Sequence, residues 1–287
     1  MATVTFRSTL KPGQVETPLD LYFFRPAAYV FVRLALPTPL SANGMTAISI
    51  ACGLAGAVLF RFAAPTTVYL ASALTLLYGI LDCADGQLAR ARGTSSRLGR
   101  ILDGMSDYIV GVASGVAMSL HLSDVMGPKG VWLAAGGLAS ILLQGTLFDH
   151  FKNRYLTLSA STYREGDDLA ETEADIARLS AQGGSPVSLF FHRVYALFLR
   201  VQAALGRQRR VERPTPELAA AYAVKLAPVA RGWAWLGPST HVLLLGVFAC
   251  AGHLALYVLL RITAGNVAMI ALFLAQSLRE KAARDAR

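Results

Sequence analysis

Four aspartates in the segment 82–107, DCADGQLARARGTSSRLGRILDGMSD, are the residues best suited to chemistry. Asp82 and Asp85 are three residues apart, and Asp103 and Asp107 are four residues apart. In a helix, each of these spacings places both side chains on one face. If the two faces meet, like charges at such short range cannot all stay ionised without a cation. The spacing therefore predicts a carboxylate site for a cation between two helices.

Carboxylate ligands without sulfur or imidazole select a hard divalent cation, so the expected cofactor is Mg²⁺ or Mn²⁺ rather than zinc. Two such ions about 3.5–4 Å apart would stabilise the attacking and leaving oxygens of a phosphoryl transfer. We expect Asp82, Asp85 and Asp103 to hold the metal, with Asp107 contributing and acting as general base. Charged residues near a bilayer are costly, so four unrelated solvated aspartates are a poor explanation.

Eight positions in this segment resemble the signature of the CDP-alcohol phosphatidyltransferase family. They are Asp82, Asp85, Gly86, Ala89, Arg90, Gly99, Asp103 and Asp107. The resemblance extends more loosely over the first four predicted membrane spans. It implies a six-helix membrane bundle, usually a homodimer, that transfers a phosphoalcohol from a CDP-alcohol to an acceptor hydroxyl and releases CMP. It does not identify the acceptor.

Three residues of the signature are expected to contact the CDP-alcohol. Gly86 has no side chain, so a ligand can approach the backbone closely, and the resemblance places the cytidine there. Arg90 is a planar and permanently charged donor that suits a pyrophosphate. Gly99 is assigned to the nucleotide site by the resemblance, and Ser96 matches a nucleotide-contacting position of some members.

Asn43 and Thr46, in the sequence SANGMT, are also predicted to contact the CDP-alcohol. They stand at the start of the first span, where free N–H groups and the helix dipole favour phosphate. They resemble the family's PNxxT-like element, although in this chain Ala42 replaces the usual Pro. An alternative role for Asn43 is that of a plain N-cap.

Lys152 and Arg154 follow the fourth span in the sequence FDHFKNR. At this spacing they cannot share a helix face, but they converge if the helix ends or unwinds there, as the change to polar residues indicates. One interpretation is a pair of topology-setting residues beside a span. The other is an anion pocket, because the segment resembles a Tyr-x-Lys-Ala-Arg stretch of bacterial members that use phosphorylated polyols, with His150 and Asn153 as departures. A phosphate needs such a cationic clamp, so this interpretation predicts a phosphorylated acceptor, inositol phosphate slightly ahead of glycerol 3-phosphate.

The composition indicates that these residues are carried by a membrane protein. Of the 287 residues, 54% are apolar and only 16% are charged, whereas soluble domains carry about 25% charged residues. The mean hydropathy is +0.45. The excess of Lys and Arg, which gives a formal charge of +9, is therefore interpreted as a signal of membrane topology. Nucleic acid is not an expected partner. The first 20 residues are mixed polar, and no cleavable signal peptide is expected.

Runs without Asp, Glu, Lys or Arg predict six membrane spans. They are residues 34–60, 62–81, 108–123, 130–148, 232–260 and 262–278. A span needs about 20 apolar residues, so the short third run is expected to extend backward through Asp103. The last two spans meet at Gly252 or at Arg261, and Gly252 is favoured because glycine punctuates helices. Residues 20–36 suit an N-terminal interfacial helix or a short connecting helix.

The predicted fold class is an all-α polytopic membrane protein with six transmembrane helices and an N-terminal interfacial helix. Of the 27 Lys and Arg residues, only Arg61, Lys129 and Arg261 fall in or near the loops on one side. By the positive-inside rule, the other side is the cytoplasm. We therefore expect a cytoplasmic (inner) membrane protein with its active site and both termini facing the cytoplasm.

Three regions are predicted along the chain: 1–150 with the interfacial helix and four spans, an insertion at 151–231, and 232–287 with two spans and a basic tail. The insertion begins with acidic residues, namely Glu165, Asp167, Asp168, Glu171, Glu173 and Asp175. Residues 187–205 then repeat apolar positions at helical spacing and end in Arg207, Arg209, Arg210 and Arg213. A membrane-surface helix that contacts anionic lipid and a solvated cap are both compatible with this pattern.

The expected function is metal-dependent transfer of a phosphatidyl group from CDP-diacylglycerol to a phosphorylated polyol in phospholipid synthesis. The expected partners are the CDP-linked lipid, the acceptor, membrane lipids and a second copy of the chain. An alternative within the family is a neutral or zwitterionic acceptor, such as serine, inositol, choline or ethanolamine, or transfer onto diacylglycerol. Alternatives outside it are a cation transporter, which would place acidic residues near the bilayer midplane, and a catalytically silent scaffold, which has no need of four aspartates.

Overall fold

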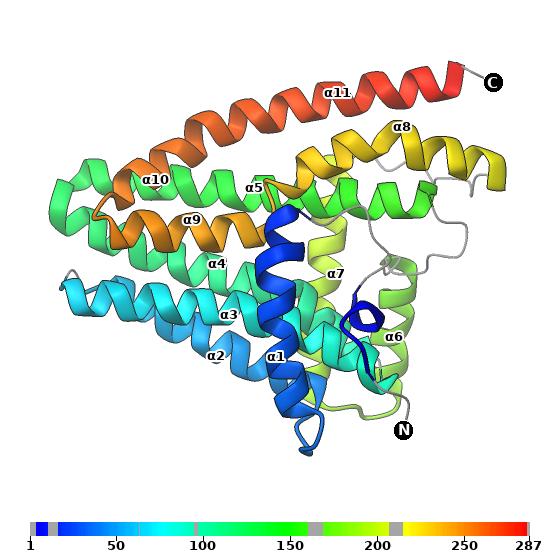
Figure 1. Cartoon of the computed structure of the whole chain (residues 1–287), viewed down its shortest axis with the longest axis horizontal. Coiled ribbons are helices and arrows are strands. Elements are labelled where there is room, and N and C mark those ends of the chain that lie inside the picture. Colours follow the sequence, from blue (N-terminus) through cyan, green and yellow to red (C-terminus); the bar gives the residue numbers. More distant parts are fainter. Residues whose placement is uncertain are drawn as a thin grey trace. The chain divides into compact units, whose positions relative to one another are not determined.

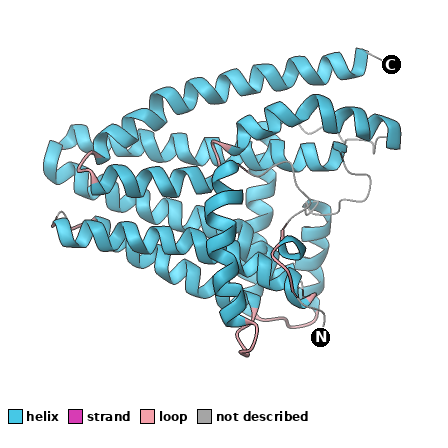
Figure 2. Cartoon of the chain, in the orientation of Figure 1, coloured by secondary structure: helices cyan, strands magenta, loops and turns pink. Residues whose placement is uncertain are grey.

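The computed structural model describes residues 4–10, 17–62, 64–94, 97–159, 169–206 and 215–285. All regular elements of this part of the chain are helices, and no strand occurs in it (Figure 2). Six of its segments are long and apolar enough to cross a membrane: Ala42–Phe60, Pro65–Arg92, Ile101–Met126, Pro128–Ser159, Pro216–Cys250 and Leu254–Glu280. The predicted all-α fold with six spans is confirmed, and the chain is a multi-pass membrane protein.

The α-helices are α1 (Arg25–Ala35), α2 (Ala42–Phe60), α3 (Pro65–Arg92), α4 (Arg97–Met126), α5 (Pro128–Ser159), α6 (Leu169–Ala181), α7 (Pro186–Gly206), α8 (Pro216–Ala234), α9 (Pro238–Cys250), α10 (Leu254–Leu260) and α11 (Asn266–Asp285). A 3₁₀ turn, η1 (Arg7–Thr9), and two π-helical turns, η2 (Asp20–Phe24) and η3 (Arg261–Gly265), complete the described elements. They form two compact units. Unit 1 is Met1–Gly145 with Leu236–Ala268, and unit 2 is Thr146–Trp235 with Met269–Arg287.

Unit 1 is built on a close contact of α2 with α3 and α4. A Cβ atom added to Gly53 of α2 would lie 2.6 Å from a methyl carbon of Val110 on α4. A Cβ added to Gly56 would lie 3.0 Å from the Ala71 carbonyl oxygen on α3. Small residues let helix backbones approach in this way inside a membrane. The glycines of α2 therefore let α3 and α4, the two helices that carry the aspartates, both approach α2 closely.

Gly53→Ala is expected to lower the stability of the protein by about 1 kcal/mol. Overpacking costs about 1–3 kcal/mol, which exceeds the gain of about 1 kcal/mol in helix propensity. The matched control is Gly111→Ala on α4, where a Cβ meets nothing within 4 Å. Thermal denaturation midpoints in detergent measure both changes. Equal shifts for the two variants would show that the contact at Gly53 is not tight.

The helix predicted at residues 20–36 is confirmed, as η2 continued by α1. Its buried residues Ala28, Val32 and Ala35 pack against α3, and α1 runs across the direction of α3 (Figure 1). The guanidinium of Arg92, in the last turn of α3, donates to the carbonyl oxygens of Ala35 (2.9 Å), Thr38 (2.8 Å) and Leu40 (2.5 Å). Since terminal carbonyls of a helix need donors, Arg92 fixes the end of α1 and the loop to α2.

The boundary between the last two spans lies at Gly252, as predicted. α9 ends at Cys250, Gly252 has a φ of +74°, and α10 begins at Leu254. A left-handed residue of this kind, most often glycine, commonly ends a helix. Arg261 lies within the sixth span, so its placement in or near a loop was wrong.

Arg261 begins the π-turn η3, and its side chain is buried. The side chain of Gln144 on α5 donates to the Arg261 carbonyl oxygen (3.0 Å) and to Asn266 Oδ1 (2.8 Å). A Cβ on Gly265 would lie 2.7 Å from Gln144 Nε2. A polar side chain that inserts into the series of backbone hydrogen bonds widens the helix at that point, which accounts for the π-turn η3.

Unit 2 contains the last part of α5, the helices α6, α7 and α8, and most of α11. Phe151 of α5 stacks on Trp233 of α8, with ring centroids 4.7 Å apart, and contacts Phe273 of α11 edge-on at 5.9 Å. α6 and α7 pack against each other as a hairpin. Residues 151 and 231, the predicted limits of the insertion, lie inside α5 and α8.

Candidate active site

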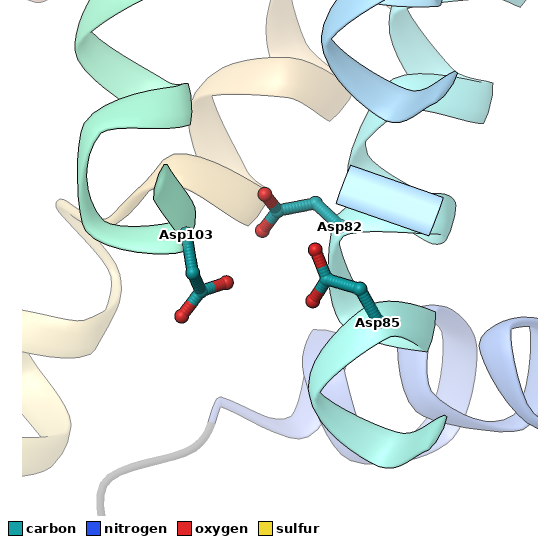
Figure 3. A group of neighbouring side chains, drawn as sticks. All are labelled: Asp82, Asp85 and Asp103. Carbon is teal, nitrogen blue, oxygen red and sulfur yellow. The ribbon is translucent and has the colours of Figure 1, made fainter. Parts of the chain in front are cut away.

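Three carboxylates from two helices gather in unit 1. Asp82 and Asp85 point from α3 toward Asp103 on α4 (Figure 3). One carboxylate oxygen of each residue lies within 4.8 Å of the others. Asp85 is buried, whereas Asp82 and Asp103 are half-buried. The i,i+3 spacing on α3 and the approach of α4 therefore create the carboxylate group that the sequence predicts.

Asp107 lies one helical turn after Asp103 and is outside this group of three. Its Oδ1 accepts a hydrogen bond from the Tyr78 hydroxyl on α3 at 2.5 Å. Tyr78 is 2% exposed and packs beside Val110. A buried hydroxyl that donates to a carboxylate fixes the orientation of that carboxylate. The structure thus places a fourth carboxylate, held by a tyrosine, next to the three clustered ones.

Two further hydroxyl groups donate to the cluster. Ser106 Oγ donates to Asp82 Oδ1 at 2.7 Å, and Thr46 Oγ1 donates to Asp85 Oδ2 at 2.5 Å. Such outer donors orient metal-ligating carboxylates. Oxygen-only donors at this density fit a hard divalent cation such as Mg²⁺ or Mn²⁺. Asp82, Asp85 and Asp103 are the residues that would hold it.

Thr46 and Asn43 both lie in the first turns of α2, as predicted. Ser41 is the N-cap of this helix, because its hydroxyl accepts from the Gly44 backbone N–H at 3.1 Å. The alternative that Asn43 is the N-cap is therefore wrong. Thr46 is buried on the Asp85 side of the helix. Its hydroxyl links the start of α2 to the carboxylate cluster.

Gly86 and Arg90 lie together one helical turn apart on α3. A Cβ on Gly86 would lie 3.4 Å from Nη1 of Arg90, so the guanidinium lies over the bare backbone of Gly86. Arg90 Nε also donates to the Thr9 carbonyl oxygen at 2.6 Å. Thr9 is fully buried, and the Tyr29 hydroxyl donates to the nearby Val4 carbonyl oxygen at 2.8 Å. The N-terminal segment 4–10 therefore helps to fix the guanidinium beside the aspartates of α3.

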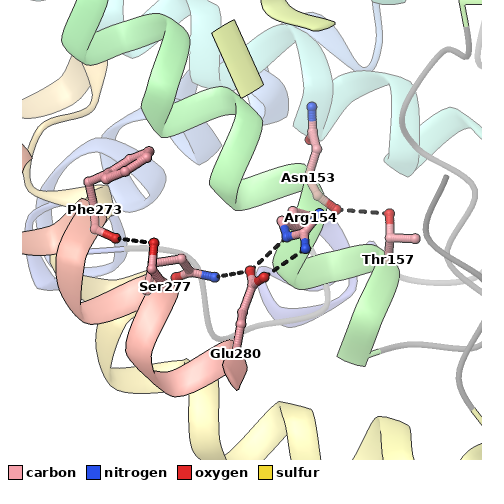
Figure 4. Close-up of polar contacts among 7 residues, drawn as sticks. Asn153, Arg154, Thr157, Phe273, Ser277 and Glu280 are labelled. Atoms are coloured by element: carbon pink, nitrogen blue, oxygen red, sulfur yellow. Dashed lines mark hydrogen bonds and ion pairs between the residues drawn. The ribbon is translucent and has the colours of Figure 1, made fainter. Parts of the chain in front are cut away.

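Lys152 and Arg154 do not converge. α5 continues as a regular helix to Ser159, so the predicted unwinding after the fourth span is wrong. Lys152 Nζ pairs with Asp149 Oδ1 at 2.8 Å. Arg154 makes two hydrogen bonds of 2.6 Å to the Glu280 carboxylate on α11, and Gln276 donates to the same carboxylate (Figure 4). Residues two apart on a continuous helix point in different directions, so the two cations have separate partners.

Ser96 lies outside the described residues. Gly99 is half-buried in the first turn of α4. Three contacts of the site escaped the sequence analysis: the hydroxyls of Ser106 and Tyr78 and the backbone carbonyl of Thr9. Ser106 carries a detectable signal, because it shares a helix with Asp103 and Asp107 and lies between them in sequence. A backbone carbonyl 81 residues away from its arginine leaves no such signal.

A comparison with protein-family models matches residues 40–171 to the CDP-alcohol phosphatidyltransferase domain. The matched range contains the four aspartates, Arg90 and the start of α2, but neither the segment 4–10 nor α7. A comparison with curated proteins found no match. The family resemblance of segment 82–107 is confirmed by the family match.

Proposed function

We propose that this chain, which carries a CDP-alcohol phosphatidyltransferase domain at residues 40–171, transfers a phosphatidyl group from CDP-diacylglycerol to a polar acceptor in a metal-dependent reaction. The observation that carries the proposal is the cluster of Asp82, Asp85 and Asp103 one turn from Asp107 and on the same helix pair as Arg90. A hard-cation site, a base and a fixed guanidinium are the groups that transfer of a charged phosphoryl unit requires.

In this proposal Asp107 accepts the proton of the acceptor hydroxyl, whose oxygen attacks the β-phosphorus of the CDP-alcohol. The bond from the β-phosphorus to the bridging oxygen breaks, and that oxygen leaves with CMP. Tyr78 keeps the Asp107 carboxylate in one orientation. Arg90 offers a permanent charge to the pyrophosphate and its leaving oxygen. Lewis-acid polarisation of the phosphates is the chemistry that bound Mg²⁺ or Mn²⁺ supplies, with two ions as the expected number.

The nucleotide is proposed to bind along Gly86 and Arg90, with Asn43, Thr46, Ser96 and Gly99 as further contacts. The Arg90 guanidinium, which lies over the backbone of Gly86, supports a phosphate-bearing ligand there. Thr46 has a second role in this proposal, since its hydroxyl orients Asp85. The acyl chains of the lipid donor would remain in the bilayer.

For the acceptor we propose a phosphorylated polyol, inositol phosphate ahead of glycerol 3-phosphate. This rests on the sequence resemblance around Lys152 and Arg154 alone, because in the structure these residues pair with Asp149 and Glu280 and do not form one clamp. The test measures CMP release by the purified enzyme with CDP-diacylglycerol and glycerol 3-phosphate, inositol 1-phosphate, inositol or serine. Turnover with the two phosphorylated acceptors is expected. Turnover with serine or inositol alone would favour the neutral or zwitterionic alternative. No metal-dependent CMP release with any lipid donor would favour the cation transporter.

Lys152→Ala and Arg154→Ala are expected to raise the acceptor KM about 10-fold or more and to leave the CDP-lipid KM nearly unchanged, because a charge-assisted bond contributes about 1.5–3 kcal/mol. Glu280→Gln is the matched control, because it breaks the bidentate pair with Arg154 but keeps the guanidinium. If Arg154 only joins α5 to α11, Arg154→Ala and Glu280→Gln will lower stability alike and shift neither KM selectively.

The proposed location is the cytoplasmic (inner) membrane, with the site and both termini on the cytoplasmic side, supported by the distribution of Lys and Arg. The proposed oligomer is a homodimer, on the family resemblance alone.

A further inference from the structure

The amphipathic helix α7 in unit 2 has an apolar stripe that is exposed within the described part of the chain. Val187, Phe190, Leu197 and Val201 are 63%, 61%, 59% and 48% exposed. With the half-buried Val194, they follow one another at spacings of three, four, three and four residues. This spacing keeps five apolar side chains on one helix face. The stripe therefore runs along most of the helix.

The opposite face of α7 is covered. His192 and Ala196 are buried, and α6 packs against α7. At one edge, Arg200 pairs with Glu173 of α6 at 2.7 Å. The hairpin thus already uses one face of α7 for its own packing, and the apolar stripe is a separate surface.

Arginines line one edge of the stripe. Arg193 and Arg200 are exposed and seven residues apart, so they lie above each other on the same side of the helix. Basic residues beside a face of Phe, Leu and Val are the pattern of a helix that lies in a membrane interface. α7 is not among the six segments apolar enough to cross a membrane in the described part of the chain.

The direction of α7 within unit 2 agrees with this pattern. α7 runs across the direction of α8 and of the last part of α5 (Figure 1). Both of these helices belong to segments that can cross a membrane. A helix perpendicular to spanning segments lies parallel to the bilayer plane.

A second copy of the chain is a poorer partner for the stripe. If two α7 helices paired as a coiled coil in antiparallel fashion, Arg193 and Arg200 would face arginines of the other copy. In a parallel pair Arg193 would face Phe198 of the other copy. Neither arrangement offers an acidic partner, whereas anionic lipid offers phosphate along the whole edge.

We propose that α7 is a membrane-surface helix that binds anionic lipid. Its stripe of Val187, Phe190, Val194, Leu197 and Val201 lies at the boundary of headgroups and acyl chains, and Arg193 contacts lipid phosphates, whereas Arg200 keeps Glu173 as its partner. Of the two interpretations that the sequence left open for this region, the exposed stripe favours the membrane-surface helix over a solvated cap. The proposal does not depend on the reaction that the aspartates perform.

The test places an environment-sensitive fluorophore on single cysteines in the intact protein. Phe190→Cys and Leu197→Cys are made in a background with Cys52, Cys83 and Cys250 replaced by alanine, and Ala177→Cys on the exposed face of α6 is the matched control. In phosphatidylcholine–phosphatidylglycerol vesicles, labels at 190 and 197 are expected to shift to shorter emission wavelengths and to lose intensity with brominated lipid. The label at 177 is expected to do neither.

Several results would overturn the proposal. Labels at 190 and 197 that stay water-exposed would identify a solvated cap. Cross-links between copies of the Phe190→Cys or Leu197→Cys variant, without quenching by brominated lipid, would identify a protein interface. Equal quenching at 177 would show that the stripe is not the contacting surface.

A measurement on the unmodified chain keeps the test independent of the cysteine background. Trypsin cleavage after Arg193 is expected to slow in phosphatidylglycerol-containing vesicles relative to pure phosphatidylcholine vesicles. Cleavage after Arg178, which is exposed on α6, serves as the control and is expected to stay the same. Identical rates after Arg193 in the two vesicles would contradict the proposed contact with anionic lipid.

Discussion

Asp107→Asn is expected to lower turnover by roughly 10²- to 10⁴-fold, the usual contribution of a general base. Asparagine has nearly the same shape and still accepts a hydrogen bond from the Tyr78 hydroxyl, so the fold and the metal cluster are expected to persist. An amide cannot accept the proton of the acceptor hydroxyl. CMP release under saturating metal, CDP-diacylglycerol and acceptor measures the change in kcat.

The matched control is Asp124→Asn near the other end of α4. Asp124 pairs with Arg61 at 2.5 Å in an exposed position and is far along the helix from the cluster. This variant is expected to keep kcat within about twofold, since an exposed ion pair contributes about 1 kcal/mol or less to stability. An Asp107→Asn enzyme that keeps near-normal kcat would show that another group removes the proton.

The aspartates of the site and the hydroxyl groups that donate to them differ in how far a sequence can predict them. Asp82, Asp85, Asp103 and Asp107 were predictable because their spacing alone places each pair on one helix face, whatever the rest of the fold does. The hydroxyls of Tyr78 and Thr46 reach aspartates 29 and 39 residues away. Such contacts depend on how α2, α3 and α4 pack, and no local pattern encodes that packing.

At the end of the fourth span, a local pattern led to a wrong prediction. The change to polar residues after Phe148 was interpreted as the end of a helix, yet α5 continues to Ser159. Residues 149–159 contain no proline and no glycine, and only such residues stop a helix strongly. The polarity at this point reports a change of environment along a continuous helix. Arg154 then finds its partner on α11, at Glu280, which is 126 residues away.

Asp85→Asn is expected to abolish activity and, without metal, to raise the thermal stability of the protein. In the metal-free state Asp82, Asp85 and Asp103 lie within 4.8 Å of one another and cannot all stay ionised without a cost to stability, and Asp85 is 3% exposed. Removing one of these carboxylates relieves this cost, and we expect a stabilisation of about 0.5–2 kcal/mol, the size that a single stabilising substitution commonly gives. The asparagine oxygen can still accept from the Thr46 hydroxyl, so the start of α2 stays attached.

Added metal is expected to reverse the order of thermal stability of wild type and Asp85→Asn. An ion that binds only the folded state stabilises it by about 2.7 kcal/mol at 100 times its Kd. Wild type is therefore expected to gain stability on titration with Mg²⁺ or Mn²⁺, whereas Asp85→Asn gains little because it has lost a ligand. Denaturation midpoints in detergent with EDTA and with increasing Mg²⁺ measure this crossing of the curves, and Asp124→Asn is expected to respond like wild type. A wild-type protein that does not respond to either ion would contradict the metal site, even if the enzyme were active. If Asp85→Asn responded as strongly as wild type, Asp85 would not be a ligand. A folded protein that has lost a carboxylate ligand binds the ion more weakly and is stabilised less by it.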